Sequence, residues 1–241
     1  MQKIKAMIQK KPFLIFSDIA SQDDVCCCFV LPVSEGNDFV LTNPDLPAQF
    51  TFQFTNLAGE LIEDQNGMHN SSEINKYNNG IIDLTGIDLA KIMAPGDCFR
   101  IKISDIISNP FQYIGCKIDE THLFDFWDDD EKEKQRIRLR CEIDNAQSKT
   151  DKNEYEDANG FVHLLSKKRR KEFQFKTDFY PEYVHDAIKE MFLYPNLVVD
   201  NEIDMFESGD YEIKWEEKDE NNNTIGTTKI SEHEISKYFN C

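Results

Sequence analysis

The chain has 241 residues and a formal net charge of −18 at pH 7. This excess of acidic groups repels nucleic acids and anionic lipid, which excludes general polyanion binding unless basic residues gather on one surface. No apolar run approaches the roughly 20 residues of a membrane helix, and the apolar stretch 13–16 is too short for a signal core, so we expect synthesis in the cytoplasm and no membrane contact.

Seven cysteines are an odd number, and three of them, Cys26 to Cys28, are consecutive and lead into an apolar segment. Neighbouring strand residues point to opposite faces, so this run predicts a strand buried on both sides rather than paired thiols. The chain has no Cys-x-x-Cys, and its other cysteines and histidines lack the spacing of zinc fingers or ribbons. We therefore expect reduced, buried thiols, no intrachain disulfide and no metal site.

Four segments alternate strictly between apolar and polar residues, which is the pattern of a strand with one buried face. They cover residues 48–54, 99–103, 136–143 and 211–216. Because these segments are spread along the whole chain, we predict antiparallel sheets as the dominant architecture. The expected fold class is mainly β, with two β-sandwich-like domains and one or two short helices.

One longer segment has a helical period, because apolar residues recur at three- and four-residue steps from Val184 to Phe192. Pro181 suits a first helical turn and Pro195 would end the helix, so we predict a helix over 181–194. A shorter helix is expected over 86–93, before the turn at 94–97. Turn signals near 108–110 divide the chain into a β-rich domain of residues 1–108 and a second of residues 109–241. Polar stretches at 63–80, 147–159 and 219–227 predict long loops between strands or locally disordered segments.

A block of five positive charges, Lys167, Lys168, Arg169, Arg170 and Lys171, stands out in this acidic chain. It follows one strand-like segment and precedes another, so we expect it in a hairpin turn or at an exposed strand edge. There it could prevent aggregation through the strand edge, contact DNA or contact an acidic protein. No aromatic residues interleave with the block, which disfavours binding of single-stranded nucleic acid. Our preferred interpretation is contact with an acidic protein surface, such as that of another copy.

The densest acidic run is Asp128, Asp129, Asp130 and Glu131, with Asp125 just before it. A calcium loop needs oxygen ligands spaced around a tight glycine turn, whereas this run has no glycine and continues into alternating lysine and glutamate. A divalent ion is therefore the lesser alternative. We predict a solvated loop or a charged contact surface that could meet the basic block of a second copy.

No set of residues has the pattern of a catalytic site. The five histidines lie in different segments, and the sequence lacks Gly-x-Ser-x-Gly, His-Glu-x-x-His and a phosphate-binding glycine loop. We therefore predict no catalytic residues and no cofactor, hence a protein that is not an enzyme. The enzymatic alternative is a hydrolase that uses paired carboxylates.

The second part of the chain, from about Ala94, resembles proteins of crAss-like Bacteroides phages and related prophages. The residues that carry the resemblance follow one another in the order of that family: 95–101, 136–139, 176–185, 210–215 and the terminal Asn240-Cys241. None of these is a catalytic motif, and residues 1–93 lie outside the resemblance.

The resemblance implies a structural subunit of the virion, a ring or hub component of the tail below the portal. It further implies a homo-oligomer with rotational symmetry that contacts neighbouring tail or portal proteins, without membrane contact or sequence-specific nucleic acid binding. A negative lumen would fit this function, because it keeps passing DNA from adhering. The alternative is a stand-alone adaptor or carbohydrate-binding module of the tail.

Overall fold

The computed structural model describes residues 12–18, 31–34, 39–47, 49–62, 75–78, 80–85, 87–115, 120–128, 134–201, 203–219, 222–232 and 235–237. Within these ranges the fold is mainly β, with two sheets and a single α-helix. The predicted fold class is confirmed in this respect. In the same ranges, no helix has the length and apolarity needed to span a membrane.

The first sheet contains seven strands from the N-terminal part of the chain. They are β1 (Phe16–Asp18), β2 (Leu31–Ser34), β4 (Gln49–Thr55), β5 (Asn75–Asn78), β7 (Cys98–Ile103), β8 (Ile106–Ser108) and β9 (Phe111–Gly115). The order is β1-β8-β7-β4-β5, with β9 pairing both β7 and β2. Its pairs are antiparallel except β2 with β9, which is parallel.

The second sheet contains ten strands. They are β3 (Val40–Thr42), β6 (Ile81–Asp83), β10 (Thr121–Trp127), β11 (Gln135–Glu156), β12 (Val162–Thr177), β13 (Asn196–Val199), β14 (Ile203–Glu207), β15 (Glu212–Lys218), β16 (Thr224–Glu232) and β17 (Ile235–Lys237). Their order is β17-β12-β16-β14-β13-β10-β11-β3-β6, and β15 pairs β16. Because β11 also pairs β12, six of these strands form a closed ring of neighbours.

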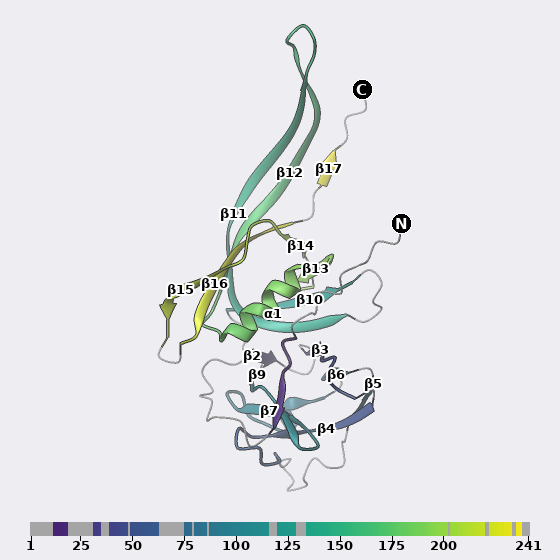
Figure 1. The fold of residues 1–241 in the computed structure, drawn as a ribbon, viewed down its shortest axis with the longest axis vertical. Helices are drawn as coiled ribbons and strands as arrows, with labels where there is room; N and C mark the ends of the chain where they lie inside the picture. Colours follow the sequence, from purple (N-terminus) through teal and green to yellow (C-terminus); the bar gives the residue numbers. More distant parts are fainter. Residues whose placement is uncertain are drawn as a thin grey trace.

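Helix α1 (Glu182–Phe192) packs against this second sheet, as Figure 1 shows. Its buried residues are Val184, His185, Ala187, Ile188, Met191 and Phe192, which confirms the predicted apolar face. Phe192 meets Phe175 of β12 edge to face, with ring centroids 5.4 Å apart. The shorter predicted helix is reduced to a single 3₁₀ turn, η4 (Leu89–Lys91).

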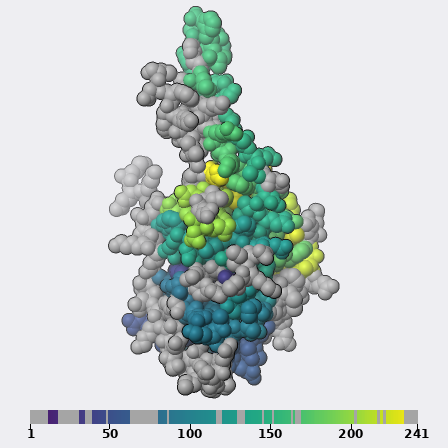
Figure 2. Space-filling model, turned by 180° about the vertical axis from the view of Figure 1, so that it is seen from behind, coloured from purple at the N-terminus to yellow at the C-terminus, as the bar shows by residue number. Residues whose placement is uncertain are grey.

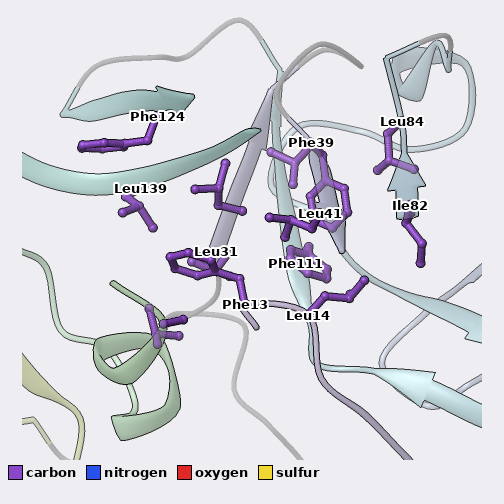
Figure 3. Packing of buried hydrophobic residues seen from close by; sticks show 14 of the residues in the cluster. Phe13, Leu14, Leu31, Phe39, Leu41, Ile82, Leu84, Phe111, Phe124 and Leu139 are labelled. Atoms are coloured by element: carbon purple, nitrogen blue, oxygen red, sulfur yellow. The ribbon is translucent and has the colours of Figure 1, made fainter. Parts of the chain in front are cut away.

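Residues from both halves of the chain share one hydrophobic core. In Figure 3, Phe13, Leu31, Phe39 and Phe111 from the first half lie near Phe124 and Leu139 from the second half. Strands β3 and β6 also come from the first half, yet β3 pairs with β11 through Val40 and Arg136. The division into domains at residue 108 stays a prediction, but the two halves contribute to the same sheet and the same core.

Three of the four predicted alternating strands bury the expected residues. Phe50, Phe52 and Phe54 are buried in β4, as are Phe99, Ile101 and Ile103 in β7; Ile137, Leu139 and Cys141 are buried in β11. The segment 211–216 differs, because Trp215 is 50% exposed. Strand β15 pairs only with β16 among the described strands, and its register shifts between Lys214 and Lys218, so an edge position exposes the indole.

The largest departure from the sequence-based expectation is a long hairpin. The loop predicted over 147–159 is wrong: β11 continues through Glu156, and β12 returns from Val162 in antiparallel register. We call residues 147–171 the hairpin arm. It projects well beyond the body of the molecule, as the ribbon in Figure 1 and the surface in Figure 2 show. At about 3.3 Å per residue, the ten residues from Gln147 to Glu156 extend roughly 30 Å.

Candidate assembly interface

The turn at the end of the hairpin arm is fixed by Asp157. Its carboxylate accepts hydrogen bonds from the backbone N–H groups of Asn159 and Phe161 at 2.8 and 3.0 Å. The backbone of Asp157 bonds Phe161 and Gly160, and Gly160 adopts a φ of +83° that favours glycine. Asn159-Gly160 is thus the hairpin signal that sequence reasoning missed, because the flanking segments are polar rather than alternating.

The basic block lies inside strand β12 rather than in a turn or at an edge. Lys167 to Arg169 pair with β11 on one side and with β17 on the other. The expected hairpin turn at 167–171 is therefore wrong. The turn-forming residues lie at 157–160 instead.

Like charges face each other across the arm. The register pairs Lys149 with Arg170 and Lys152 with Lys167, against one pair of opposite charges, Asp151 with Lys168. Directly opposed like charges destabilise an antiparallel pair. Beyond residues 167–169, where β17 adds a third strand, the arm has only two described strands, and an isolated two-stranded hairpin is marginal in water. Every side chain described between Gln147 and Glu156 is exposed. The arm therefore gains little from its own packing and would gain from an anionic partner.

Ion pairs and a cation–π contact join the base of the arm to the body. The guanidinium of Arg170 lies 5.8 Å from the centroid of the Phe206 ring in β14. Lys171 forms an ion pair with Glu232 of β16 at 3.2 Å. Glu172, at the end of the basic block, accepts from Lys149 and Lys229 at 3.5 and 3.3 Å. Arg170 and Lys171 thus have structural contacts with the body, while Arg169 donates to Ser148 within the arm at 2.7 Å.

The end of the arm exposes apolar side chains on a hairpin that carries no core of its own. Tyr155, Phe161, Val162 and Leu164 are 54%, 66%, 62% and 47% exposed. Large exposed apolar groups gathered at one place mark contact surfaces more often than single scattered ones. The end of the arm is therefore a second candidate contact region beside the basic block.

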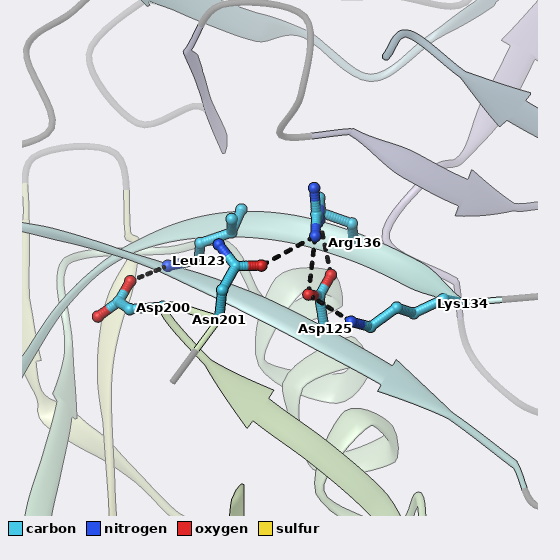
Figure 4. Close-up of polar contacts among 6 residues, drawn as sticks. All are labelled: Leu123, Asp125, Lys134, Arg136, Asp200 and Asn201. Atoms are coloured by element: carbon cyan, nitrogen blue, oxygen red, sulfur yellow. Dashed lines mark hydrogen bonds and ion pairs between the residues drawn. The ribbon is translucent and has the colours of Figure 1, made fainter. Parts of the chain in front are cut away.

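Only one residue of the predicted acidic run can be placed. Asp128 is partly buried next to β10, whereas Asp129, Asp130 and Glu131 lie outside the described residues. Asp125 is not a surface group: its side chain is 1% exposed and accepts from Arg136 at 2.7 and 2.9 Å and from Lys134 at 2.8 Å (Figure 4). Burial alone would raise the pKa of the Asp125 carboxyl, but the two cations outweigh it and lower that pKa. Asp125 therefore stabilises the fold and is not available to a second copy.

A second group of acidic residues, which sequence reasoning missed, lies around strand β15. Residues 207–220 carry seven acidic residues against Lys214 and Lys218, a formal charge of −5. Asp210 and Glu212 are exposed there, and Trp215 adds an exposed indole. Burial, and then the negative charge of Asp210, raise the pKa of Glu207, although its hydrogen bond from Thr228 opposes this. The sequence signal was the net negative charge of this segment. It was overlooked because only the alternation of apolar and polar residues was considered there.

Another group of titratable side chains is formed by His122, Asp200 and Cys141. His122 meets Asp200 at 2.7 Å, beside the buried Cys141. By residue type this resembles a Cys/His/Asp set, but burial raises the pKa of the Cys141 thiol well above its ordinary value, which opposes the thiolate that a nucleophile needs. Among the described residues, no cluster of three or more His, Cys, Asp or Glu could hold a metal ion.

Cys98 corrects one expectation from the sequence. It is disulfide-bonded, and because Cys141 is free, its partner lies outside the described residues. The odd number of cysteines and the lack of a small-domain cysteine framework led to the opposite expectation. Neither feature excludes a single bridge between segments that only the fold brings together.

No protein-family model, curated protein or solved structure matches this chain.

Proposed function

We propose that this protein is a structural subunit of a homo-oligomer, in which the hairpin arm of each copy contacts a neighbouring molecule. The hairpin arm is the observation that carries the proposal. It extends roughly 30 Å, exposes every described side chain from Gln147 to Glu156 and opposes like charges across its two strands. Such an element adds little to the stability of one subunit, so contact with a neighbour is the function that accounts for it.

We further propose a ring or hub component of a bacteriophage tail below the portal as the specific assembly. The resemblance of residues 94–241 to proteins of crAss-like phages supports this part. A projecting arm fits it, because an arm that contacts a different surface on the next copy gives a head-to-tail interface, and such interfaces close into rings when the rotation permits. Neighbouring tail or portal proteins would then contact the axial faces of the ring.

The test is to measure the particles that the purified chain forms, alone and mixed with proteins encoded by neighbouring genes. We expect discrete particles of high mass by mass photometry and rings by negative-stain electron microscopy. A stand-alone adaptor or carbohydrate-binding module would remain a monomer or small oligomer in both conditions, and that result would overturn the proposal.

A matched variant isolates the arm. Replacing residues 154–165 with Asn-Gly shortens the arm, since this dipeptide favours a two-residue hairpin turn. It keeps the basic block and its pairing with β17 and removes only the exposed end. We expect a folded subunit with the wild-type melting temperature that no longer forms large particles. Unchanged particles would show that the end of the arm is dispensable for assembly.

A further inference from the structure

The hairpin arm has one open strand edge. Among the described strands, β11 pairs only with β12 over residues 147–156, so its other edge has no partner there. The outer edge of β12 differs, because β17 pairs with it at residues 167–169, on the side of the arm away from β11 (Figure 1). An open edge presents backbone N–H and C=O groups to any strand that adds to it.

The open edge of β11 is long and regular. The register with β12 shifts twice: β11 has one extra residue between Asp144 and Gln147, and β12 has one between the partners of Asn153 and Glu154. β11 itself is therefore uninterrupted from Gln147 to Glu156, and this stretch contains no proline or glycine. Bulges, prolines and short strands are ways in which proteins close an edge. Their absence from this stretch leaves an edge suited to strand addition.

The charges along this edge decide which strand can add to it. Lysines protect an edge by opposing a second cation, so a partner strand must bring an acidic residue to each of them. Lys152, Asn153 and Glu154 are exposed, and their side chains form no hydrogen bond or ion pair with any described residue. The lysine and the glutamate are thus both available to a second molecule.

The sequence around Asn153 is complementary to itself. When two identical strands pair antiparallel about a two-fold axis, the residue at the axis faces its own copy, and residues equally far from the axis on either side face each other. With Asn153 at the axis, Lys152 of each copy faces Glu154 of the other, and Thr150 faces Glu156. Every other centre from Thr150 to Glu156 opposes like charges within β11. The charge pattern therefore selects one register.

We infer that the β11 edges of two copies pair antiparallel about Asn153, so that their arms join into one sheet. This inference rests on the proposed function and names the partner of the arm as the arm of a second copy. Main-chain hydrogen bonds provide the affinity, and the two pairs of Lys152 with Glu154 fix the register. Two joined arms form a sheet of four strands, whereas one arm alone is a marginal two-stranded ribbon.

The contact is isologous, because the same edge is used on both copies, and it joins copies in pairs. Closure of a ring then falls to a contact between two different surfaces, as in the assembly proposed above.

Two charge-reversed variants test the register. Lys152→Glu opposes acidic groups at both symmetry-related positions, and Glu154→Lys opposes basic groups there. We expect each variant to weaken self-association about tenfold at low salt, because opposed like charges destabilise an antiparallel pair, and to do so less at high salt. Sedimentation velocity measures this. Asp105→Lys, an exposed site between β7 and β8, is the matched control and should associate like wild type.

The two variants rescue each other if the inference is right. In an equimolar mixture, both pairs across a mixed dimer again unite opposite charges, so association recovers although neither variant associates well alone. A chain that carries both Lys152→Glu and Glu154→Lys also recovers, because each pair is exchanged as a whole. Circular dichroism verifies that each variant is folded.

A cysteine at the axis reports the pairing directly. Asn153→Cys places two thiols opposite each other, where a disulfide or a short thiol-reactive crosslinker can join them. Thr150→Cys is the matched control: Thr150 faces Glu156 of the other copy, so its own two copies lie roughly 20 Å apart along the strands. Mass spectrometry of the digested protein separates such links from those through native cysteines. We expect a link between two copies of residue 153 and none between two copies of residue 150.

The outcomes separate this inference from the proposed function. If wild type assembles and neither reversal weakens it, the mixture fails to recover, or the link at residue 153 does not form, the edge pairing is overturned while the structural function stands. If wild type remains a monomer, both are overturned. If wild type forms pairs linked at residue 153 but no larger particles, the edge pairing is supported and the ring is overturned.

Discussion

The imidazole of His185 connects three elements through hydrogen bonds. Its Nε2 lies 2.8 Å from the carbonyl oxygen of Thr224, which can only accept, so Nε2 carries the proton. Nδ1 then accepts from the hydroxyl of Tyr211 at 2.7 Å. A Cβ at Gly226 would overlap that hydroxyl, so glycine is required where Tyr211 crosses β16. Helix α1, the start of β15 and β16 thus share one neutral histidine.

Burial lowers the pKa of His185, although the carbonyl of Thr224 opposes this. The unfolded chain takes up a proton near the ordinary value of about 6.5, while the folded chain takes it up only at lower pH. Stability is therefore fully present above that value and falls as pH decreases, by at most about 1.4 kcal/mol per pH unit. Urea unfolding at pH 7.5, 6.5 and 5.5 should show this decline in wild type.

The variant His185→Gln removes the titrating group. We expect it to be less stable than wild type at pH 7.5 and to lose less stability between pH 7.5 and 5.5. The matched control is His122→Gln, which changes a more exposed histidine paired with Asp200 and leaves the contribution of His185 in place. An equal decline in wild type and in His185→Gln would contradict the prediction.

At the scale of an element, the residues in and just after helix α1 show how side-chain burial determines what a substitution costs in free energy of unfolding. Ile188 is fully buried in the core that the helix forms with the second sheet. Replacing it with alanine should lower the free energy of unfolding by about 2–5 kcal/mol, through lost burial and the cavity left behind. Leu193→Ala, at a site that is 61% exposed just after the helix, should cost less than about 0.5 kcal/mol. Chemical denaturation measures both.

A cost below about 1 kcal/mol for Ile188→Ala would place the apolar stripe at a surface. In that case, the helix itself would become a candidate subunit interface.

The elements that sequence predicted well are those in which local pattern and burial agree. The alternation of Phe50, Phe52 and Phe54 and the helical period from Val184 both come from one buried face. Sequence reasoning failed for the arm, because every described side chain from Gln147 to Glu156 is exposed and these residues therefore show no apolar alternation. Its strands are specified by backbone pairing and by the turn at Asp157, which periodicity does not report.

The sequence predicted which basic residues belong to the candidate interface, but not where they lie in the fold. The basic block was evident from its charge, but its placement in mid-strand depended on a hairpin that the pattern concealed. The acidic run at 128–131 was chosen for density alone, and its neighbour Asp125 is occupied by Arg136 and Lys134. The acidic residues around β15 are more dispersed in sequence, and only the structure shows that Asp210 and Glu212 are exposed there.

At the scale of the whole molecule, the two halves depend on each other. Phe13 packs against Phe126 with ring centroids 6.3 Å apart, and the side-chain oxygen of Asn109 accepts from the backbone N–H of Ile15 at 2.9 Å. We expect residues 1–108 and 109–241, expressed separately, to be much less stable than the full chain, because each exposes part of the shared core. Thermal unfolding and the dispersion of amide resonances would measure this. Two fragments with native-like melting would show that the halves are independent domains, as the sequence suggests.

The pairing of β3 with β11 also matters while the chain is being made. Thr42 bonds the side chain of Gln135 across 93 residues of sequence. Synthesis proceeds from the N-terminus at about 5–20 residues per second, so β6 leaves the ribosome on the order of 3–10 s before β11. During that interval, β3 and β6 present strand edges whose partner has not yet been translated, and such edges can pair with those of nearby nascent chains. Slower translation between residues 83 and 135 would therefore favour mispairing on polysomes.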